Sequence, residues 1–227
     1  MEYMLDTANL DEIAKWVDIC PIGGVTSNPS ILKREGQVPF FAHMRRIRQL
    51  IGQERSLHIQ VTAGDCAGML QEAEAILEKV DSKVFIKVPV TEEGLKAIQR
   101  LKAKGVGVTA TAVYSKAQGY LAGAAGADYL APYCNRMANL DIDPWETVKS
   151  LRLVFDQNHI STKILGASFK NMAQVNAALL AGAHAVTVDP SLLRDALRLA
   201  PLEKAVADFQ ADWKAVRGQV GLDQLED

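Results

Sequence analysis

The sequence has little of what disulfide scaffolds and metal sites require. Its 227 residues include three cysteines and four histidines. Cys20, Cys66 and Cys134 lie far apart, form no C-x-x-C pair and have no histidine at ligand spacing. An odd number of cysteines in a chain without an export signal is typical of reduced, buried thiols. We therefore expect no disulfide framework, no metal and no cofactor. The histidines are scattered, and we expect them to pair with nothing nearby.

Long apolar runs, a leader segment and an excess of charge are also missing. No stretch approaches 18 uninterrupted apolar residues, which argues against a membrane-spanning helix. The first ten residues carry Glu2 and Asp6 but no basic or apolar region of a secretory signal, so we expect a cytoplasmic protein. A net charge of −2 gives no broad basic surface and argues against nucleic acid or an anionic membrane as a partner.

Short apolar segments alternate with amphipathic segments along the chain. The predicted strands are 3–5, 24–26, 57–61, 84–88, 107–109, 128–130, 163–166 and 185–188. The predicted helices are 10–20, 67–79, 94–104, 115–123, 145–155, 172–180 and 192–197, with Asn9 and Thr91 as helix entry signals. Alternation of strand and helix indicates parallel strands joined by right-handed crossovers. Eight strands at roughly 26-residue spacing predict a (β/α)8 TIM barrel.

No linker or low-complexity segment interrupts this alternation, so the sequence predicts one domain, 1–227, with an extra C-terminal helix at about 202–220. The alternative is an open doubly wound sheet, which usually carries G-x-G-x-x-G after its first strand. Here the first strand leads into Asp6-Thr-Ala-Asn9, which has no glycine, and Gly105-Val-Gly107 precedes a strand. We therefore favour the closed barrel.

Nearly every predicted strand ends on a polar side chain, and barrel enzymes carry their active sites at the carboxyl ends of the strands. These side chains are Asp6, Thr26, Asn28, Gln60, Lys87, Thr109, Thr111, Tyr133, Asn135, Arg136 and Ser168. One polar strand end is weak support for a site, because strand ends are often polar. Together they predict a dense polar site at one mouth of the barrel.

Lys87 gives the sharpest chemical indication. It lies in the segment VFIKVPV, residues 84–90, whose other members favour a buried strand. Parallel strands are covered on both faces, so we expect Lys87 to point into the barrel. Burial lowers the pKa of a lysine and leaves a neutral amine that can attack a carbonyl. The alternative is a lysine that reaches the barrel rim and pairs with a carboxylate such as Asp6.

Arg136 and Ser168 suit an anion. Ser168 precedes a helix expected to start near Asn171, and barrels often bind phosphate at such a helix N-terminus. An arginine adds bidentate, charge-assisted hydrogen bonds. The alternative is an ordinary surface salt bridge or helix cap.

Seven segments of the chain resemble the small transaldolase family, and most closely its fructose-6-phosphate aldolase branch. They are LDTAN (5–9), GVTSNPS (24–30), IKVPVTEEGL (86–95), TAVYS (111–115), APYCNR (131–136), ASFK (167–170) and DFQADW (208–213). The resemblance covers nearly the whole chain in order. It implies a class I aldolase without a metal, in which Lys87 forms a Schiff base with a ketone donor.

The resemblance also implies roles for the other site residues. Gln60, Thr111 and Tyr133 match the residues that hold the catalytic water and move protons, and Asp6 matches one that contacts the lysine. Transaldolases carry Glu at the position of Gln60 and usually Phe at that of Tyr133. Glutamine cannot act as a general base, whereas a tyrosine near the lysine can relay protons. These two positions favour aldol cleavage and addition over dihydroxyacetone transfer.

For the substrate, the resemblance assigns Asn28 to the donor hydroxyls, Thr26 to the lining of the pocket, and Arg136 with Ser168 to a phosphate. The chain departs from the family pattern at Ser27, where threonine is usual, and in segment 137–144, which lacks the glycines typical of the aldolase branch. That segment borders the expected phosphate site.

The expected activity is that of a Schiff-base aldolase acting on ketose phosphates of the fructose 6-phosphate type. Its substrates would be dihydroxyacetone or hydroxyacetone and an aldehyde such as glyceraldehyde 3-phosphate. The alternatives are a transaldolase, a phosphosugar isomerase and a non-catalytic paralogue that binds sugar phosphates. The full set of site residues argues against the last of these.

Apolar residues recur at four- and three-residue steps in the C-terminal segment: Leu202, Val206, Phe209, Trp213, Val216 and Val220. This spacing predicts a helix with a narrow apolar seam. One interpretation is that the helix packs on its own barrel. The resemblance implies that it crosses to a neighbouring subunit of a homo-oligomer, a pentamer or decamer.

Overall fold

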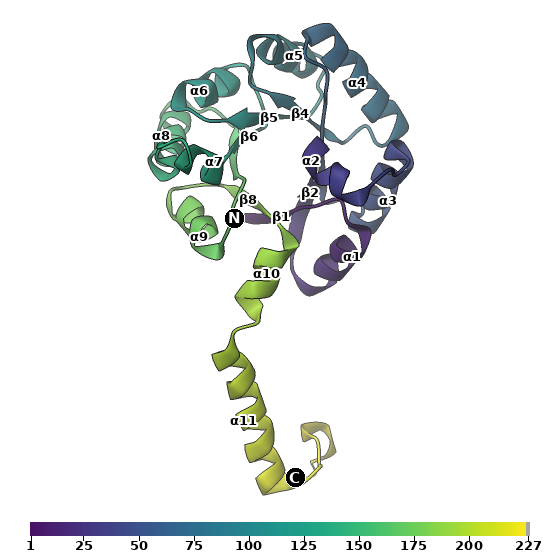
Figure 1. The fold of residues 1–227 in the computed structure, drawn as a ribbon, viewed down its shortest axis with the longest axis vertical. Helices are drawn as coiled ribbons and strands as arrows, with labels where there is room; N and C mark the ends of the chain where they lie inside the picture. Colours follow the sequence, from purple (N-terminus) through teal and green to yellow (C-terminus); the bar gives the residue numbers. More distant parts are fainter. Residues whose placement is uncertain (226–227) are drawn as a thin grey trace. The chain divides into compact units, whose positions relative to one another are not determined.

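The computed structural model describes residues 1–225 and divides into two compact units, residues 1–190 and the segment from residue 191 onward. In the first unit, eight parallel strands close into a barrel in sequence order, as predicted (Figure 1). They are β1 (Glu2–Asp6), β2 (Ile22–Thr26), β3 (Ser56–Gln60), β4 (Phe85–Pro89), β5 (Val108–Val113), β6 (Tyr129–Pro132), β7 (Lys163–Gly166) and β8 (Ala185–Val188). The (β/α)8 fold class is therefore confirmed.

Helices surround the barrel and connect successive strands. They are α1 (Leu10–Ile19), α2 (Pro29–Leu32), α3 (Phe40–Ile51), α4 (Cys66–Lys79), α5 (Glu92–Ala103), α6 (Lys116–Ala124), α7 (Cys134–Ala138), α8 (Pro144–Gln157) and α9 (Met172–Leu180). A 3₁₀ turn, η1 (Lys33–Glu35), follows α2, and α10 (Pro190–Leu197) begins at the boundary between the units. The Asn9 side chain accepts a hydrogen bond from the backbone N–H of Glu12, and Thr91 caps α5 in the same way.

Three of these helices were not predicted. Helices α2 and α7 are single turns that start directly after the polar strand ends, where the sequence indicated a loop. Helix α3 carries a recognisable signal, because Met44, Ile47 and Ile51 repeat at helical spacing and are all buried. It lacks a side-chain cap and starts after Pro39, so no entry signal pointed to it.

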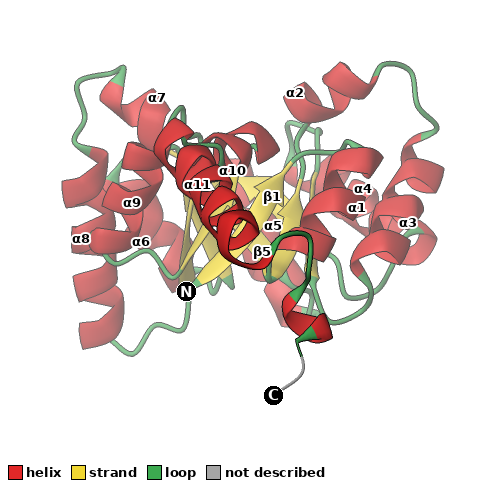
Figure 2. Cartoon of the chain, turned by 90° about the horizontal axis from the view of Figure 1, so that it is seen from below, coloured by secondary structure: helices red, strands yellow, loops and turns green. Residues whose placement is uncertain are grey.

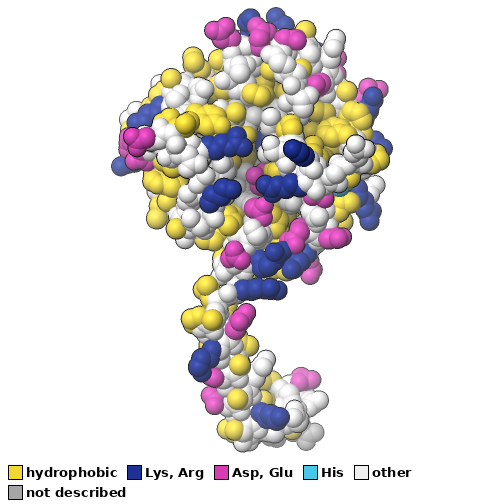
Figure 3. Space-filling view, viewed as in Figure 1, with side chains coloured by type: hydrophobic (Ala, Val, Ile, Leu, Met, Phe, Trp, Pro, Cys, Tyr) yellow, Lys and Arg dark blue, Asp and Glu magenta, His cyan; other side chains and the backbone are white. Residues whose placement is uncertain are grey.

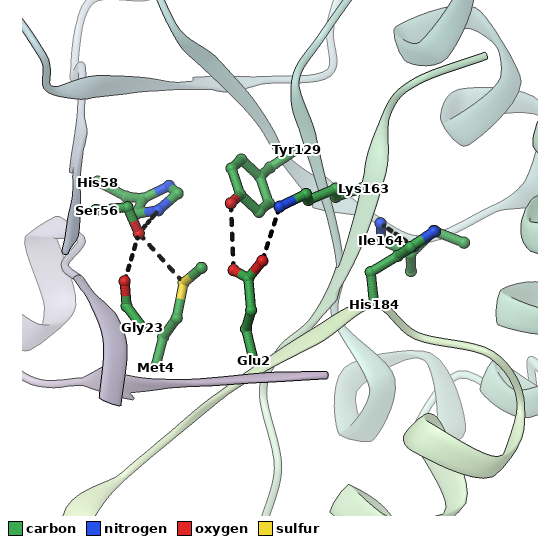
Figure 4. A network of polar contacts seen from close by, with 9 residues as sticks. All are labelled: Glu2, Met4, Gly23, Ser56, His58, Tyr129, Lys163, Ile164 and His184. Carbon is green, nitrogen blue, oxygen red and sulfur yellow. Dashed lines mark hydrogen bonds and ion pairs between the residues drawn. The ribbon is translucent and has the colours of Figure 1, made fainter. Parts of the chain in front are cut away.

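The carboxyl ends of the strands lie at the end of the barrel where α2 and α7 are found, away from the N-terminus (Figure 2). At the opposite, amino end, the Glu2 carboxylate accepts a hydrogen bond from the Tyr129 hydroxyl and pairs with Lys163 at 2.7 Å (Figure 4). Buried Met4 and Leu165 belong to a core cluster with Tyr129 in the barrel interior. The amino end of the barrel thus holds its own polar network around Glu2, beside this apolar cluster, apart from the polar strand ends at the carboxyl end.

The second unit contains α11 (Ala200–Arg217), which begins two residues before and ends three residues before the predicted 202–220. The Trp213 indole donates a hydrogen bond to the Val220 carbonyl at 2.8 Å, which folds the segment after the helix back on it. No helix in residues 1–225 is both long and apolar enough to cross a membrane.

Candidate active site

Lys87 is 3% exposed in the middle of β4, as its apolar neighbours indicated. Its Nζ donates a hydrogen bond to the Ser27 carbonyl at 3.0 Å. Burial lowers the pKa of Lys87 below 10.5, and the carboxylate of Asp6 partly offsets this effect. The lysine therefore lies in the barrel interior, not at the rim, and its amine loses its proton more readily than an exposed lysine.

A chain of short hydrogen bonds connects Asp6 to two further strands. The Thr26 hydroxyl donates to Asp6 Oδ1 at 2.7 Å. A hydroxyl carries one proton, so the Thr26 oxygen accepts the proton of Thr187, also 2.7 Å away. Burial raises the pKa of Asp6, whereas nearby Lys87 lowers it. Thr187, at the end of β8, was missed from the sequence, and it fixes Thr26 toward the carboxylate.

Thr111 on β5 and Tyr133, the residue between β6 and α7, face each other with their hydroxyls 3.0 Å apart. Burial raises the pKa of Tyr133, and the hydrogen bond with Thr111 partly offsets this rise. The β5–β6 register shifts between Ala110 and Val113, and Ala112 has a φ of 57°. A left-handed conformation is costly for a residue with a side chain, and such strain gathers at functional sites. Because its pKa is raised, Tyr133 is a phenol able to donate a proton.

Gln60 lies at the end of β3 as the register partner of Lys87 on β4. Its side-chain Oε1 is buried and has no hydrogen-bond partner among the described residues. A buried, unsatisfied amide oxygen costs about 1–3 kcal/mol. A water or substrate hydroxyl that donates to this oxygen would remove that cost, so Gln60 is suited to hold one beside the lysine.

His58 precedes Gln60 by two residues on β3, and its side chain is completely buried. Its ring stacks on Phe85, with the ring centroids 4.8 Å apart. Its Nε2 is 2.9 Å from the Ser56 hydroxyl, which in turn donates to the Gly23 carbonyl (Figure 4). The Ser56 oxygen therefore accepts the Nε2 proton, and Nδ1 accepts from the Thr109 hydroxyl at 2.7 Å. The prediction that the histidines pair with nothing was wrong here, because the partners come from other positions and strands in the barrel.

Arg136 lies on the opposite side of the site, in α7. Its guanidinium is 4.8 Å from the centre of the Tyr133 ring and donates to the Tyr114 hydroxyl at 3.3 Å. The backbone N–H of Asn135, beside it, donates to the Ser168 carbonyl, so α7 and the end of β7 are held together. Ser168 has a φ of 63°, a second strained residue at the site. Arg136 and Ser168 thus share one edge of the mouth, with the arginine exposed to solvent.

Asn28 has a structural task beside its expected one. Its side-chain oxygen accepts a hydrogen bond from the backbone N–H of Ile31 and caps α2, with a distance of 3.0 Å. The amide NH₂ group is not part of this cap, so its two N–H donors are not used by the cap.

Figure 3 views the carboxyl-end mouth, where Lys and Arg side chains gather around the centre with acidic side chains between them. Two charged residues of this mouth were missed from the sequence: Arg34 in η1 and Asp189 directly after β8, whose side chains pair at 3.2 Å. Within residues 1–225, no group of three or more His, Cys, Asp or Glu side chains could hold a metal ion. Cys66 and Cys134 are buried as expected, and Cys20 is half-buried.

These features define a (β/α)8-barrel protein with a buried lysine among acidic, phenolic and amide groups at the carboxyl ends of its strands. Comparison with known proteins shows to which family of (β/α)8-barrel proteins the chain belongs. The family model "Transaldolase/Fructose-6-phosphate aldolase" matches residues 3–220. A probable fructose-6-phosphate aldolase of Streptococcus pneumoniae is 52% identical over 217 residues, which cover 96% of this chain and 98% of that one. The chain belongs to the transaldolase/fructose-6-phosphate aldolase family and is an enzyme of the aldolase or transaldolase type.

Proposed function

We propose that this protein is a Schiff-base aldolase that forms and cleaves ketose phosphates of the fructose 6-phosphate type. The observation that carries the proposal is Lys87, a buried amine with a lowered pKa that lies beside Asp6 and in register with Gln60. A neutral amine at the bottom of a polar mouth is the nucleophile that a carbonyl donor requires. The 52% identity to a probable fructose-6-phosphate aldolase supports the same reaction.

The reaction begins when Lys87 attacks the ketone carbonyl of dihydroxyacetone or hydroxyacetone. The carbinolamine that forms loses its hydroxyl as water and becomes an iminium ion. Asp6 is placed to stabilise that cation, and its orientation is fixed by Thr26. The hydroxyls of the donor then lie near the free amide donors of Asn28.

Removal of a proton from the carbon next to the iminium gives an enamine, which is the carbon nucleophile. A water held by Gln60 and the Tyr133–Thr111 pair carries this proton and returns it to the oxygen of the aldehyde during addition. The aldehyde's phosphate binds to Arg136 and Ser168, whose edge of the mouth is cationic. Hydrolysis of the product iminium releases the ketose phosphate and restores Lys87.

The alternative within the family is transfer of a dihydroxyacetone unit between two sugar phosphates. Gln60 and Tyr133 favour the free-donor reaction, because the amide is no base and the phenol has an exchangeable proton. Two assays separate the reactions: cleavage of fructose 6-phosphate to free dihydroxyacetone, and transfer from fructose 6-phosphate to erythrose 4-phosphate. We expect cleavage without an acceptor. A reaction that proceeds only with erythrose 4-phosphate would identify a transaldolase, and no turnover in either assay would contradict the proposal.

We also propose that the protein is a homo-oligomer, a pentamer or decamer, whose C-terminal helix packs on a neighbouring subunit. In its support, α11 carries an apolar seam in which Phe209 and Val216 are 70% and 77% exposed. An apolar seam of this kind is stabilised when a second surface covers it. The expected molecular mass in solution is a multiple of that of the chain, and a monomeric mass would contradict this proposal.

A further inference from the structure

The amino end of the barrel contains a hollow of about 700 Å³ that the proposed reaction does not use. Apart from Arg48 of α3, its lining residues lie at the starts of strands β1 to β7 or in the loops that lead into them. The active-site side chains Asp6, Lys87 and Tyr133 are not among them. A volume of this size is typical of pockets for small molecules, which span roughly 300–1,000 Å³.

Two glycines leave this space open. Gly23 on β2 and Gly107, which directly precedes β5, line the hollow without a side chain. A Cβ at Gly107 would lie 2.9 Å from the ring of Phe85, so glycine lets this ring lie close to the start of β5. The rings of Phe85 and Tyr129 pack edge to face, with centroids 5.2 Å apart, and give the hollow an apolar wall.

Charged side chains form much of the remaining lining. They are Arg48, Arg55, Lys83, Lys163, Glu2 and Glu54. Two of the cations have carboxylate partners, because Arg48 pairs with Asp81 and Lys163 pairs with Glu2, each at 2.7 Å. Figure 4 shows the second pair, with the Tyr129 hydroxyl on the same carboxylate. These two cations are therefore neutralised within the chain.

Arg55 is preorganised to bind an anion. Its Nε donates a hydrogen bond to the Ile22 carbonyl at 2.9 Å, and its Nη1 donates to the Ile51 carbonyl at 3.1 Å. Within residues 1–225, its Nη2 has no hydrogen-bond partner, and no carboxylate lies within ion-pair distance of the guanidinium. A guanidinium fixed in this way loses little freedom when it binds a ligand.

The charges that remain favour a doubly charged anion. Lys83 is exposed on the same hollow and has no carboxylate partner in the described part of the chain. Arg55 and Lys83 together outweigh Glu54, the one lining carboxylate outside the ion pairs. A phosphate monoester carries up to two negative charges and accepts two parallel hydrogen bonds from an arginine. Carboxylate oxygens on the lining can accept hydrogen bonds from hydroxyls of the same molecule.

We propose that this hollow is a second ligand site, at the amino end of the barrel, which binds a small phosphorylated molecule through Arg55 and Lys83. The phosphate lies against these two cations. The rest of the molecule lies against the Phe85–Tyr129 wall, with its hydroxyls toward Glu2 and Glu54. The site does not depend on the proposed aldolase reaction, which takes place at the other end of the barrel.

The test is a calorimetric titration with glycerol 3-phosphate, a phosphate monoester with two hydroxyls and no carbonyl that could react with Lys87. The titrated protein is Arg136→Gln, so that the cation expected to bind a phosphate at the carboxyl-end mouth is absent. We expect one molecule bound per chain. Adding Arg55→Gln should raise the Kd by about 10- to 100-fold, the effect of losing a charge-assisted hydrogen bond.

Lys83→Gln is the second variant, because Arg55→Gln also removes the bonds to the Ile22 and Ile51 carbonyls and can loosen the loop. The Lys83 side chain makes no such bond, and its loss should raise the Kd by about 2- to 5-fold, as for an exposed ion pair. The matched control is Arg45→Gln on α3, which removes an exposed arginine that donates to the Lys79 carbonyl and does not line the hollow. Its Kd should equal that of the Arg136→Gln background.

No binding to Arg136→Gln overturns the proposal, and so does a Kd that Arg55→Gln leaves unchanged. A higher Kd in Arg55→Gln with no change in Lys83→Gln also overturns it, because a loosened loop would then explain the loss. The proposed function is judged separately. In the Arg136-containing protein, Arg55→Gln should leave kcat for cleavage of fructose 6-phosphate unchanged, and absence of cleavage in wild type would refute the aldolase without affecting this site.

Discussion

At the scale of single residues, the site places groups that can exchange protons near a buried amine. Lys87 has lost the solvation that normally keeps lysine charged, and the Asp6 carboxylate and the Tyr133 phenol are titratable groups of the same site. Burial moves all three toward their neutral forms, since it raises the pKa of Asp6 and Tyr133 and lowers that of Lys87. These shifts bring the pKa values of the amine and of the carboxyl group closer together, which makes proton transfer between such groups easier.

Tyr133→Phe tests the phenol without changing the shape of the ring. We expect kcat for aldol cleavage to fall by about 10²- to 10⁴-fold, the usual contribution of a positioned acid–base group. Formation of the Schiff base at Lys87 should survive, because the lysine does not need the phenol for its attack. The control is Tyr120→Phe on α6, which removes the same hydroxyl outside the site. Equal kcat values for wild type and Tyr133→Phe would exclude the phenol from proton transfer.

The sequence was sufficient to find residues whose position in their own strand reveals them. Lys87 is such a case, since burying a lysine within an apolar strand is energetically costly and therefore indicates a functional role. His58, Thr187 and Asp189 could not be found in this way. Their significance lies in bonds to distant parts of the chain: His58 with Thr109, Thr187 with Thr26, and Asp189 with Arg34, which are 51, 161 and 155 residues apart. Arg34 resembled any exposed lysine or arginine until the barrel brought it to Asp189.

At the scale of elements, the site depends on the short connections between each strand and the helix that follows it. Helix α5 begins directly after β4, the strand of Lys87, and a Cβ added to Gly94 in its first turn would collide with the Pro89 carbonyl. Glycine therefore lets the helix start close to the strand end. The Thr91 cap, which bonds the Gly94 N–H, fixes the same turn.

Gly94→Ala should destabilise the fold by about 1–3 kcal/mol, because the added methyl forces the strand end and the helix apart. Chemical denaturation measures this loss, and aldol activity should fall with it, since Pro89 is two residues from Lys87. Gly64→Ala is the matched control, because a Cβ there would meet nothing within 4 Å. Equal losses of stability in the two variants would contradict the close-approach explanation.

Elements were predictable where their ends carried signals. Asn9 and Thr91 cap the helices that they were expected to cap. Strand β5 was predicted too short, as 107–109. It runs on to Val113, and its register with β6 shifts around the left-handed Ala112. The single-turn helices α2 and α7 are too short for periodicity to reveal.

At the scale of the whole molecule, the alternation of strands and helices was enough to predict the closed barrel, because parallel strands leave few other topologies. The filling of its interior was less predictable. The barrel holds His58 in a completely buried position below the site, and burial there lowers its pKa well below 6.5, with Lys87 and Arg48 adding to the effect.

This burial gives the fold an acid dependence. Below about pH 6.5 the unfolded chain binds a proton at His58 that the folded chain does not, so the free energy of unfolding falls by about 1.4 kcal/mol per pH unit until the lowered pKa is reached. We expect His58→Phe, whose ring fits between Phe85 and Tyr129, to show a smaller loss of stability between pH 7 and pH 5 than wild type.

Denaturant titration at the two pH values measures this difference, which does not depend on the absolute stability of the variant. His159→Asn is the control, because it removes an exposed histidine at a left-handed position that asparagine tolerates. Its loss of stability should match that of wild type. Parallel curves for wild type and His58→Phe would contradict a neutral His58 in the folded barrel.

The central claim is that Lys87 forms a covalent Schiff base with a ketone donor. The most direct measurement is mass spectrometry of the protein after incubation with dihydroxyacetone and sodium borohydride, which reduces an iminium to a stable amine. We predict one adduct per chain, mapped to the peptide that contains Lys87 and absent from Lys87→Met, while Lys170→Met is labelled as wild type. No adduct on wild type, or an adduct that persists in Lys87→Met, would contradict the account.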